Sequence, residues 1–439
     1  MSKPSKTTGN ASKKITSNAP NDNVTVADSH QTITVTGDWS TVFDNGSHNL
    51  TKLLGSNESA IVSGDHASVV ATGINAYVEL NGDHGSADLS GEAAFAVVTG
   101  DHNDVVGSGV DSGVSLAGTH NRITMDGDQS AVTDRGSDND ITLHGFQGAA
   151  NLFGSDSTAT STGLDDSIRM TGTDNTAIVL GDDSTVTDMG VGNHTILSGD
   201  GDNAMLSGSH GTLEVDGDDA AVNLTRFSAQ NTVIVTGDNA SIVDAGSGDS
   251  FVLSGDHETL MVTGSNAHIT STGADNAISV RGADHTIVAS NATIGLGNSA
   301  IASLHGDHNN ISMGTSAALT LTGGLDDVVD ASSAGDADVL TFGDVFGHDH
   351  LWFAQSGADL VITVIGTERD VTVADWFDSP DSRITTIKTT DGYALSDAGV
   401  GKLVQAMAAF TPPPLGTTDL PDPLAQALAP ALTDNWVLL

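Results

Sequence analysis

The stretch Gly64-Asp-His-Ala-Ser-Val-Val-Ala-Thr72 is one copy of a nine-residue repeat that decides the fold. Its glycine recurs every nine residues from Gly37 to Gly217 without a break, which makes twenty-one consecutive glycines. A fixed period this short is the signature of one structural unit stacked many times along an axis. The sequence therefore predicts a solenoid rather than a globular fold with mixed connections.

Within each repeat, numbered from its glycine as position 1, a turn precedes a short strand. Positions 6 and 8 hold most of the Val, Ile, Leu, Met and Ala, and polar residues stand between them. Alternation with a period of two is typical of a strand with one buried face. Gly with Asp, His or Asn supplies the turn, because glycine tolerates a positive φ and Asn or Asp hydrogen-bond their own backbone. We therefore predict an all-β fold, a parallel β-solenoid of the β-roll type.

Two periodicities compete for the length of one coil. Asp134, Ser161 and Asp188 at position 8 recur every twenty-seven residues, which favours a three-sided coil. Residues at positions 3 and 4 instead recur at multiples of eighteen: His30, His48, His66, His84, His102 and His120, and Asn49, Asn103, Asn121, Asn139, Asn175 and Asn193. Ala, Val and Leu can fill the space between two sheets about 10 Å apart, whereas a triangle with nine-residue sides leaves a destabilising void. We expect eighteen residues per coil, with twenty-seven as the alternative.

The nine-residue register is interrupted twice. It slips by two residues at Arg226-Phe227, resumes at Gly237, and falters again between Asn291 and Leu296. A β-bulge or a tolerated loop explains such an interruption, and a binding protrusion is the alternative interpretation.

The composition excludes several classes of protein. The chain of 439 residues has a formal net charge of −43, so it lacks the basic face that a general nucleic-acid binder needs. It contains no cysteine, and it has no apolar run long enough to span a membrane. So much negative charge makes the solenoid soluble and self-repelling, and we expect divalent cations or salt to affect its compactness.

The first 27 residues differ from the repeats. They are polar, lack the apolar core of a secretory signal, and hold four of the fourteen basic residues, namely Lys3, Lys6, Lys13 and Lys14. We expect residues 1–27 to form either a disordered tail or a basic arm that docks on the acidic body of a neighbouring subunit. The solenoid is then predicted over residues 28–322.

The pattern changes after residue 322. Two glycine- and aspartate-rich segments, each with a short apolar strand, come first: Gly-Gly-Leu-Asp-Asp-Val-Val-Asp-Ala at 323–331 and Gly-Asp-Ala-Asp-Val-Leu-Thr-Phe at 335–342. Further patterns predict two strands around a Ser-Gly-Ala-Asp turn, a third strand, a strand with an Asp-Gly turn, and a helix, at 350–367, 370–377, 383–393 and 397–410. A Pro-containing tail occupies residues 411–439.

This order of motifs resembles the C-terminal domain of RTX-type proteins, which type I secretion systems export. The resemblance covers residues 323–439, roughly a quarter of the chain. It implies an RTX-like domain over residues 323–410, an uncleaved secretion signal in the region 411–439, and folding outside the cell.

The resemblance also implies calcium. In the RTX nonapeptide, turn carbonyls and an Asp two residues before an apolar strand residue bind the ion, and oxygen ligands suit Ca²⁺. Asp327 and Asp338 occupy that place, with Asp326 and Asp336 beside them. The main array departs from the motif, because its position 6 is apolar, as at Val69. We therefore expect calcium mainly in the C-terminal domain and at contacts between subunits.

The sequence contains few motifs for catalysis or for transition-metal binding. The chain has neither His-Glu-x-x-His nor Gly-x-Ser-x-Gly, and its carboxylates lie at turns with few aromatic residues nearby, so we predict no enzymatic activity. The histidine row suggests Zn²⁺ or Cu²⁺ binding, or repulsion between protonated rings, against the simpler interpretation that His suits the turn. The Asp row at position 2 either recruits Ca²⁺ between solenoids or is a solvated acidic edge. A Thr-rich ice-binding face is disfavoured because Val70, Val106, Arg169 and Glu79 interrupt the columns.

Together these patterns predict a secreted, non-enzymatic structural protein, exported by the type I secretion machinery and dependent on calcium. A solenoid exposes unpaired strand edges at its ends, and these promote head-to-tail stacking that extends instead of closing. The expected product is an extracellular filament, surface layer or biofilm matrix, with the chain itself as partner. The alternative function is an adhesin that binds a glycan or a host surface.

Overall fold

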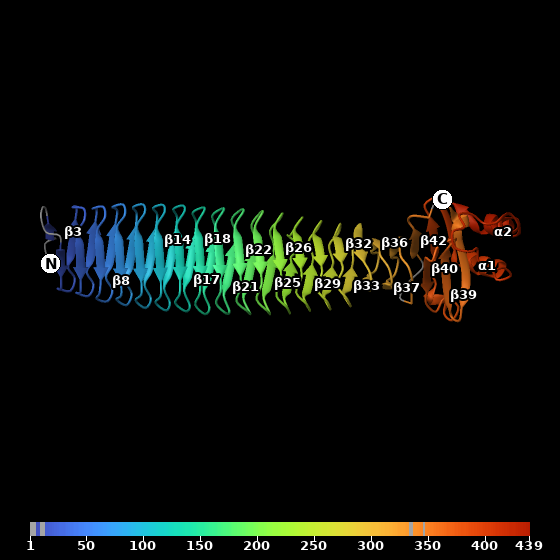
Figure 1. Cartoon of the computed structure of the whole chain (residues 1–439), viewed down its shortest axis with the longest axis horizontal. Helices are drawn as coiled ribbons and strands as arrows, with labels where there is room; N and C mark the ends of the chain where they lie inside the picture. Colours follow the sequence, from blue (N-terminus) through green and yellow to red (C-terminus); the bar gives the residue numbers. More distant parts are fainter. Residues whose placement is uncertain (1–5, 9–13, 333–336, 346) are drawn as a thin grey trace. The chain divides into compact units, whose positions relative to one another are not determined.

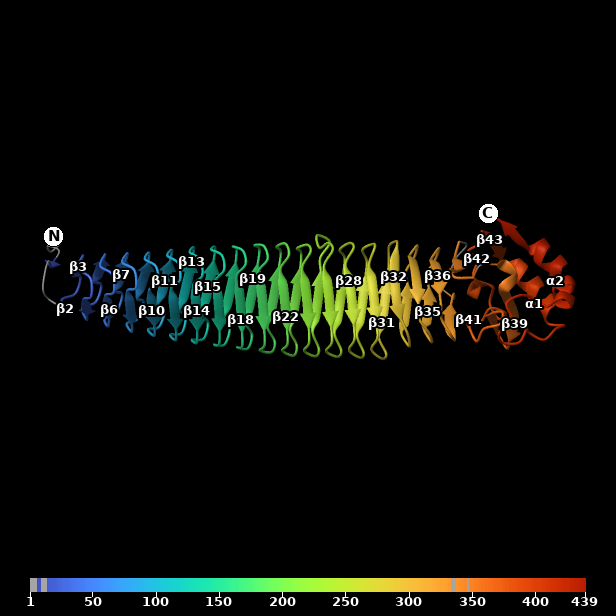
Figure 2. The same cartoon turned by 45° about the horizontal axis from the view of Figure 1, so that its top comes forward.

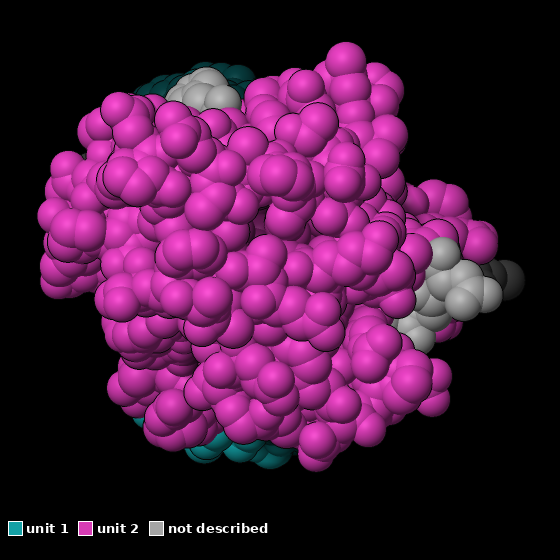
Figure 3. Space-filling model, turned by 90° about the vertical axis from the view of Figure 1, so that its right-hand side faces the viewer, with its two compact units in different colours: residues 1–221 teal, residues 222–439 magenta. Residues whose placement is uncertain are grey.

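The computed structural model describes residues 6–8, 14–332, 337–345 and 347–439. The chain divides into two compact units, residues 1–221 (unit 1) and 222–439 (unit 2), coloured separately in Figure 3.

Unit 1 is a regular series of short parallel strands (Figures 1 and 2). Strands β2 (Lys14–Ser17) to β24 (Thr212–Val215) are four residues long and begin nine residues apart, as the repeat predicts. Odd-numbered strands form one sheet and even-numbered strands the other. Each residue pairs with the residue eighteen positions later, for example Val105 with Ile123 and Val114 with Val132. The predicted eighteen residues per coil are therefore confirmed, and the three-sided alternative is wrong.

The core lies between the two sheets and is built from positions 6 and 8. In β8 (Ser68–Ala71), Val69 and Ala71 are buried while Ser68 and Val70 lie on the outer face. Position 3 adopts a positive φ, as at His66 with 57°, which is the turn conformation that the sequence predicts. Small aliphatic side chains thus fill a thin two-sided core.

Position 4 forms a polar corner that links successive coils. The backbone N–H of Asn103 donates to Oδ1 of Asn121 at 2.8 Å, and the N–H of Asn121 donates to Oδ1 of Asn139 at 2.8 Å. The same bond joins Asn175 to Asn193 at 2.9 Å. The ladder matters because a buried N–H without a partner destabilises a fold.

The twenty-seven-residue period of Asp134, Ser161 and Asp188 does not come from a three-sided coil. Its polar members point into the core and bond to the next corner: Asn139 Nδ2 donates to Asp134 Oδ1 at 2.8 Å, and Asn193 Nδ2 donates to Asp188 Oδ1 at 2.6 Å. Twenty-seven residues are one and a half coils, so successive members alternate between sheets. Within one sheet they recur only every three coils, or about 14 Å at 4.8 Å per coil. The rhythm keeps buried carboxylates apart.

The solenoid begins earlier than the predicted boundary at residue 28. Strands β2 and β3 (Asn23–Val26) pair in parallel with β4 (Thr32–Val35) and β5 (Thr41–Asp44), and β1 (Lys6–Thr8) pairs with β3. Residues 14–26 are therefore part of the sheets, and the prediction of an arm over residues 1–27 is wrong in extent. Ala19 and Asp28 stand where later repeats have glycine, which hid the register, although the inward Ile15, Val24 and Val26 are buried.

Unit 2 continues the parallel pattern with local irregularities. Strands β26 (Thr232–Val235) to β31 (Ala277–Val280) again begin nine residues apart. Later strands vary in length and spacing: β32 (His285–Ala289), β33 (Thr293–Leu296), β34 (Ile301–His305), β35 (Asn310–Met313), β36 (Ala318–Thr322), β37 (Asp327–Asp330) and β38 (Val339–Phe342). The slip at Arg226-Phe227 is a tight turn in which Ser228 N donates to Thr225 O at 2.9 Å. The parallel coil thus runs past residue 322, as far as Phe342.

Antiparallel strands and two helices end the coil of unit 2 (Figure 1). In one sheet, β41 (Asp370–Val373) pairs with β37 and is followed outward by β40 (Asp359–Val364) and β39 (Leu351–Ser356). In the other, β42 (Thr386–Thr389) pairs with β38 and is followed by β43 (Tyr393–Ser396) and β44 (Trp436–Leu438). Short 3₁₀ turns lie at His348–His350 and Pro380–Ser382. This arrangement confirms a small C-terminal β-rich region.

The helices pack on these outer strands. Helix α1 (Asp397–Met407), predicted from the spacing of Val400, Leu403, Val404 and Met407, contacts β39 and β43. A second helix, α2 (Asp422–Asn435), packs on α1 and lies in the segment that the sequence marked only as a Pro-containing tail. Pro430 lies inside α2, which explains why a helix was not expected there.

A glycine test follows from the stacking of the coils. In Gly154→Ala the new Cβ would lie 1.6 Å from the carbonyl oxygen of Gly136. The coils must move apart, so we expect the free energy of unfolding to fall by at least about 2 kcal/mol. Denaturant unfolding followed by circular dichroism measures this. The control Gly401→Ala, whose Cβ meets nothing within 4 Å, should leave stability unchanged or slightly raised. Equal stability of the two variants would contradict the close contact.

Candidate functional site

Some corners hold a carboxyl group where other coils have Asn or Ser. Glu58, Asp202 and Glu258 are fully buried, and one oxygen of each has no hydrogen-bond partner among the described residues. Burial raises the pKa of Glu58 and of Asp202 to about 7 and that of Glu258 to about 8. Neighbouring aspartates add to the shift, for example Asp38 beside Glu58. These carboxyls therefore change charge near neutral pH.

Two buried carboxyls of unit 2 contact each other directly. Asp244 lies at an inward position and Asp249 at the following corner. Burial raises the pKa of both, and their mutual hydrogen bond and charge help to raise the pKa of Asp244 to about 7. Two buried carboxyls in contact favour one shared proton.

Asp326, Asp327 and Asp338, the three predicted calcium ligands that the structure describes, do not form one cluster. Asp327 is buried at a corner, where its Oδ1 accepts from the backbone N–H of Asn309 at 2.8 Å while Oδ2 has no partner among the described residues. Asp338 occupies the corner before β38 in the other sheet, and its Oδ1 accepts from the Ala317 N–H at 3.1 Å. Both aspartates thus continue the corner ladder. Asp336 lies outside the described residues.

Asp326 lies next to Asp327 and is largely exposed. Its carboxylate is 3.4 Å from Nε2 of His308. It also hydrogen-bonds to Asp370, whose pKa is raised by burial and by this contact. Two carboxyls in contact favour a shared proton or a cation between them. Across the described part of the chain, however, no three or more His, Cys, Asp or Glu side chains are arranged to hold a metal ion.

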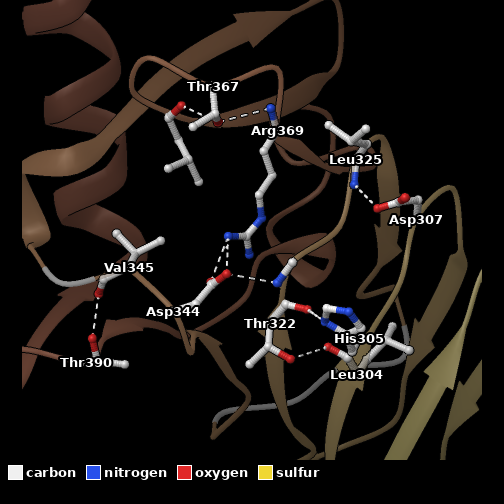
Figure 4. Close-up of polar contacts among 12 residues, drawn as sticks. Leu304, His305, Asp307, Thr322, Leu325, Asp344, Val345, Thr367, Arg369 and Thr390 are labelled. Atoms are coloured by element: carbon white, nitrogen blue, oxygen red, sulfur yellow. Dashed lines mark hydrogen bonds and ion pairs between the residues drawn. The ribbon is translucent and has the colours of Figure 1, made fainter. Parts of the chain in front are cut away.

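An ion pair ties the glycine turn near Asp327 to the β40–β41 connection (Figure 4). Arg369 Nη1 lies 2.7 Å and 2.8 Å from the two oxygens of Asp344, and Asp344 Oδ2 also accepts from the Gly323 N–H at 3.0 Å. In the same region Leu325 N donates to Asp307 Oδ1 at 2.9 Å. Gly323 and Gly324 have φ of 80° and 94°, a conformation that favours glycine. Hydrogen bonds from Gly323 and Leu325 to the carboxylates of Asp344 and Asp307 therefore hold this turn.

The histidine row is a stack of imidazoles along one edge of unit 1. The ring centroids of His30 to His120 are between 4.8 and 5.1 Å apart and the rings are within 7° of parallel. A zinc ion bound to two neighbours would need nitrogens within about 4.2 Å, twice the Zn–N distance of about 2.1 Å. This spacing does not favour a metal between stacked rings, and all six residues have the positive φ of the turn.

Two neighbouring hollows of unit 1 share Arg135. One has a volume of about 460 Å³ and lies over the small residues Gly113 and Ala131, next to the half-exposed ring of Phe95. The other has a volume of about 500 Å³ and is lined by Phe153 and by the hydroxyl residues Thr119, Ser137, Ser155 and Thr173. The guanidinium of Arg135 lies 5.3 Å from the centroid of Phe153. A cation, two partly exposed aromatic rings and a row of hydroxyls therefore line these hollows.

No known protein-family model matches the chain. Among the described residues, no helix is both long and apolar enough to cross a membrane.

Sequence reasoning missed the hollows and the buried carboxyls. Phe95, Arg135 and Phe153 are far apart in sequence, and only the eighteen-residue register brings them to one surface. Glu58 and Glu258 had a detectable signal, because each stands at position 4 where the repeat has Asn or Ser.

The buried carboxyls predict how stability depends on pH. Their pKa is higher in the folded chain, about 7 to 8, than the usual 3.8 to 4.5. Their contribution is therefore complete below about pH 4 and is lost as the pH rises through 7 and 8. We expect the free energy of unfolding to fall between pH 5 and pH 8. In Glu258→Gln that fall should be smaller by at least about 1 kcal/mol.

Urea unfolding at both pH values measures this difference. The control Glu92→Gln changes an exposed glutamate at position 2 of a repeat in unit 1 and should keep the wild-type pH dependence. An unchanged pH dependence in Glu258→Gln would show that Glu258 does not titrate in this range.

Proposed function

We propose that this chain is a secreted, non-enzymatic structural protein that assembles with copies of itself into an extracellular filament, surface layer or biofilm matrix. The observation that supports assembly is the presence of an open strand edge in each unit. In unit 1, β1 pairs with β3 on one side, and the described residues provide no strand for its other side. In unit 2, β44 pairs with β43 and exposes Val437 and Leu438.

An open, apolar strand edge is a template for pairing with another chain. Because the edge at β44 differs from the edge at β1, contact between them is heterologous and extends the assembly without closing it. Assembly is therefore head to tail. Export by a type I system remains part of the proposal and rests on the RTX-like order of motifs after residue 322.

Calcium is proposed as the ion that controls assembly. The contact between the carboxyls of Asp326 and Asp370 and the unpartnered oxygen of buried Asp327 support a divalent cation in this part of unit 2. At the net charge of −43, divalent ions also reduce repulsion between copies.

Electron microscopy of the purified chain with millimolar calcium and with a chelator tests assembly. We expect fibres or sheets with calcium and fewer or none with the chelator. Val437→Lys combined with Leu438→Lys places charge on the β44 edge and should abolish assembly without unfolding the chain. The control Phe410→Lys, an exposed apolar residue outside the strands, should assemble as the wild type does.

One further result tests self-assembly, and another tests the position of the calcium ion. Single particles at high concentration with calcium would refute self-assembly. Asp327→Asn keeps an oxygen that can accept from Asn309 N–H, so loss of calcium dependence in this variant would assign the ion to Asp327, and unchanged dependence would place it elsewhere.

A second candidate function, an adhesin for a glycan, is favoured by the hollows around Arg135. Sugar rings stack on aromatic faces, hydroxyl groups bond to Ser and Thr, and a guanidinium pairs with a carboxylate. The chemistry fits an acidic polysaccharide better than a neutral one. The alternative would lead if the chain binds glycans but does not assemble.

Affinity electrophoresis in gels with polygalacturonate, methyl-esterified polygalacturonate or dextran tests this candidate. We expect retardation by polygalacturonate only, weakened about tenfold in Arg135→Gln because one charged contact is lost. The control Arg122→Gln removes the same charge from the other sheet, where Arg122 lies 3.6 Å from Asp140, and should bind as the wild type does. Equal loss in both variants would indicate unspecific charge attraction.

A further inference from the structure

The stacked histidines are part of a longer column of residues on one edge of unit 1. The column comprises the position-3 residues that precede the even-numbered strands, and after His120 it continues with Asp138, Asp156, Asp174, Gly192 and His210. Backbone bonds of one kind connect its coils, such as His120 N to Ser137 O at 3.3 Å and Asp138 N to Ser155 O at 3.2 Å. The edge therefore presents six imidazoles followed by three carboxylates at one constant spacing.

This order of residues is complementary to itself. A two-fold axis across the edge, midway between His120 and Asp138, places a second, antiparallel copy in register with the first. His120 then faces Asp138 of that copy, His102 faces Asp156, and His84 faces Asp174. Symmetry repeats each contact, so six imidazole–carboxylate pairs form together. Farther out, His66 faces Gly192 and His48 faces His210, so no carboxylate of the column meets another carboxylate.

The position-2 residues form a second row beside this column, and this row is compatible with the same two-fold axis. Position 2 holds Asp65, Asp83 and Asp101 next to the histidines. The two-fold axis places these aspartates opposite Val191, Thr173 and Ser155, respectively, so they also avoid like charges. The Thr119 backbone N–H donates to Asp101 Oδ1 at 2.7 Å, and the pKa of Asp101 is lowered by hydrogen bonds from Thr119 and by His102 and His120. These contacts favour the ionised form of Asp101 beside the imidazoles.

Arg135 borders this edge, because it lines a hollow together with Thr119 and Ser137 of position 2. Four of the strands that follow the turns begin with a titratable or charged residue, namely Asp104, Arg122, Asp140 and His194. Arg122 and Asp140 form an ion pair with each other, and His194 lies 3.1 Å from Glu214. The column, the aspartates of position 2, Asp104 and Arg135 together determine the charge along the edge. Neutral imidazoles leave it acidic, whereas protonated imidazoles make one half basic and the other half acidic.

We propose that two copies of this chain pair side by side, antiparallel, through the histidine–aspartate edge, and that pairing strengthens as the histidines gain protons. At neutral pH the acidic copies repel each other. In mildly acidic solution each imidazolium gains a carboxylate partner from the second copy, which also offsets repulsion between stacked rings 4.8 to 5.1 Å apart. This pairing adds a lateral contact to the proposed end-to-end assembly. Only its role in a matrix rests on the proposed function.

Sedimentation velocity at about pH 5.5 and about pH 7.5 tests the pairing, since histidine changes charge between these values. The full chain with Val437→Lys and Leu438→Lys is used, so that contact through β44 does not interfere. We expect a dimer at the lower pH with an association constant at least about tenfold higher than at the upper pH, and weakening by high salt.

Triple variants locate the contact. The combinations His84→Gln, His102→Gln, His120→Gln and Asp138→Asn, Asp156→Asn, Asp174→Asn should each lose the gain at low pH. An equimolar mixture of the two should dimerise again, more weakly than the parent, because three of the six imidazole–carboxylate pairs form between the two variants. The matched control changes Asp111, Asp165 and Asp183 to Asn, at position 3 of the opposite edge, and should dimerise like the parent.

The possible outcomes are distinct. A parent that stays monomeric at both pH values, a mixture that does not dimerise, or a control that loses dimerisation equally would each overturn the proposal. Fibres in microscopy without lateral dimers would leave the assembly function standing alone. Lateral dimers without fibres would refute end-to-end assembly and keep the pairing.

Discussion

Close contact between glycines of successive coils is the constraint on which the rest of this structure depends. The corner at Gly154 passes so near the carbonyl oxygen of Gly136 that a Cβ would lie 1.6 Å from it, and Gly73 and Gly181 show the same contact with the coil before them. At these three corners no side chain other than hydrogen fits, whereas Ala19 and Asp28 take the equivalent position near the start of the solenoid. Because each coil must turn this corner, the coils stay at the distance of paired β-strands, and equivalent residues of successive coils lie in columns.

Stacking in columns stabilises some residue types and destabilises others. Asparagines gain from stacking, since the oxygen of one accepts from the backbone of the next, as Asn121 and Asn139 do. Stacked carboxylates are destabilised, because like charges one coil apart repel each other. The structure separates the inward aspartates by three coils within a sheet, and burial raises the pKa of the corner glutamates so that they are neutral in mild acid. The net charge of −43 is therefore that of the outer surface more than of the core.

The same geometry determines what the surface offers to partners. Chemistry is arranged in rows along an edge, such as the histidine–aspartate column, and not gathered in one deep cleft. A row of constant spacing can match another such row, and the proposed pairing of two copies uses this match. The hollows around Arg135 are the local exception, formed where Gly113 and Ala131 leave space beside Phe95.

The sequence by itself determined the repeat, the strands at positions 5 to 8, the inward positions and the turn at position 3, because these depend only on alternation and on the backbone freedom of Gly, Asn and Asp. It also indicated the C-terminal strands and α1. Only the tertiary structure decided which residues stack: the pairing of Val105 with Ile123 excluded the three-sided coil, and strand pairing showed that residues 14–26 belong to the sheets although Ala19 and Asp28 replace glycine. The burial of Glu58 and the meeting of Arg135 with Phe95 likewise depend on the coil register. Local pattern specifies an element, whereas the partner of that element is determined by contacts between residues eighteen positions apart.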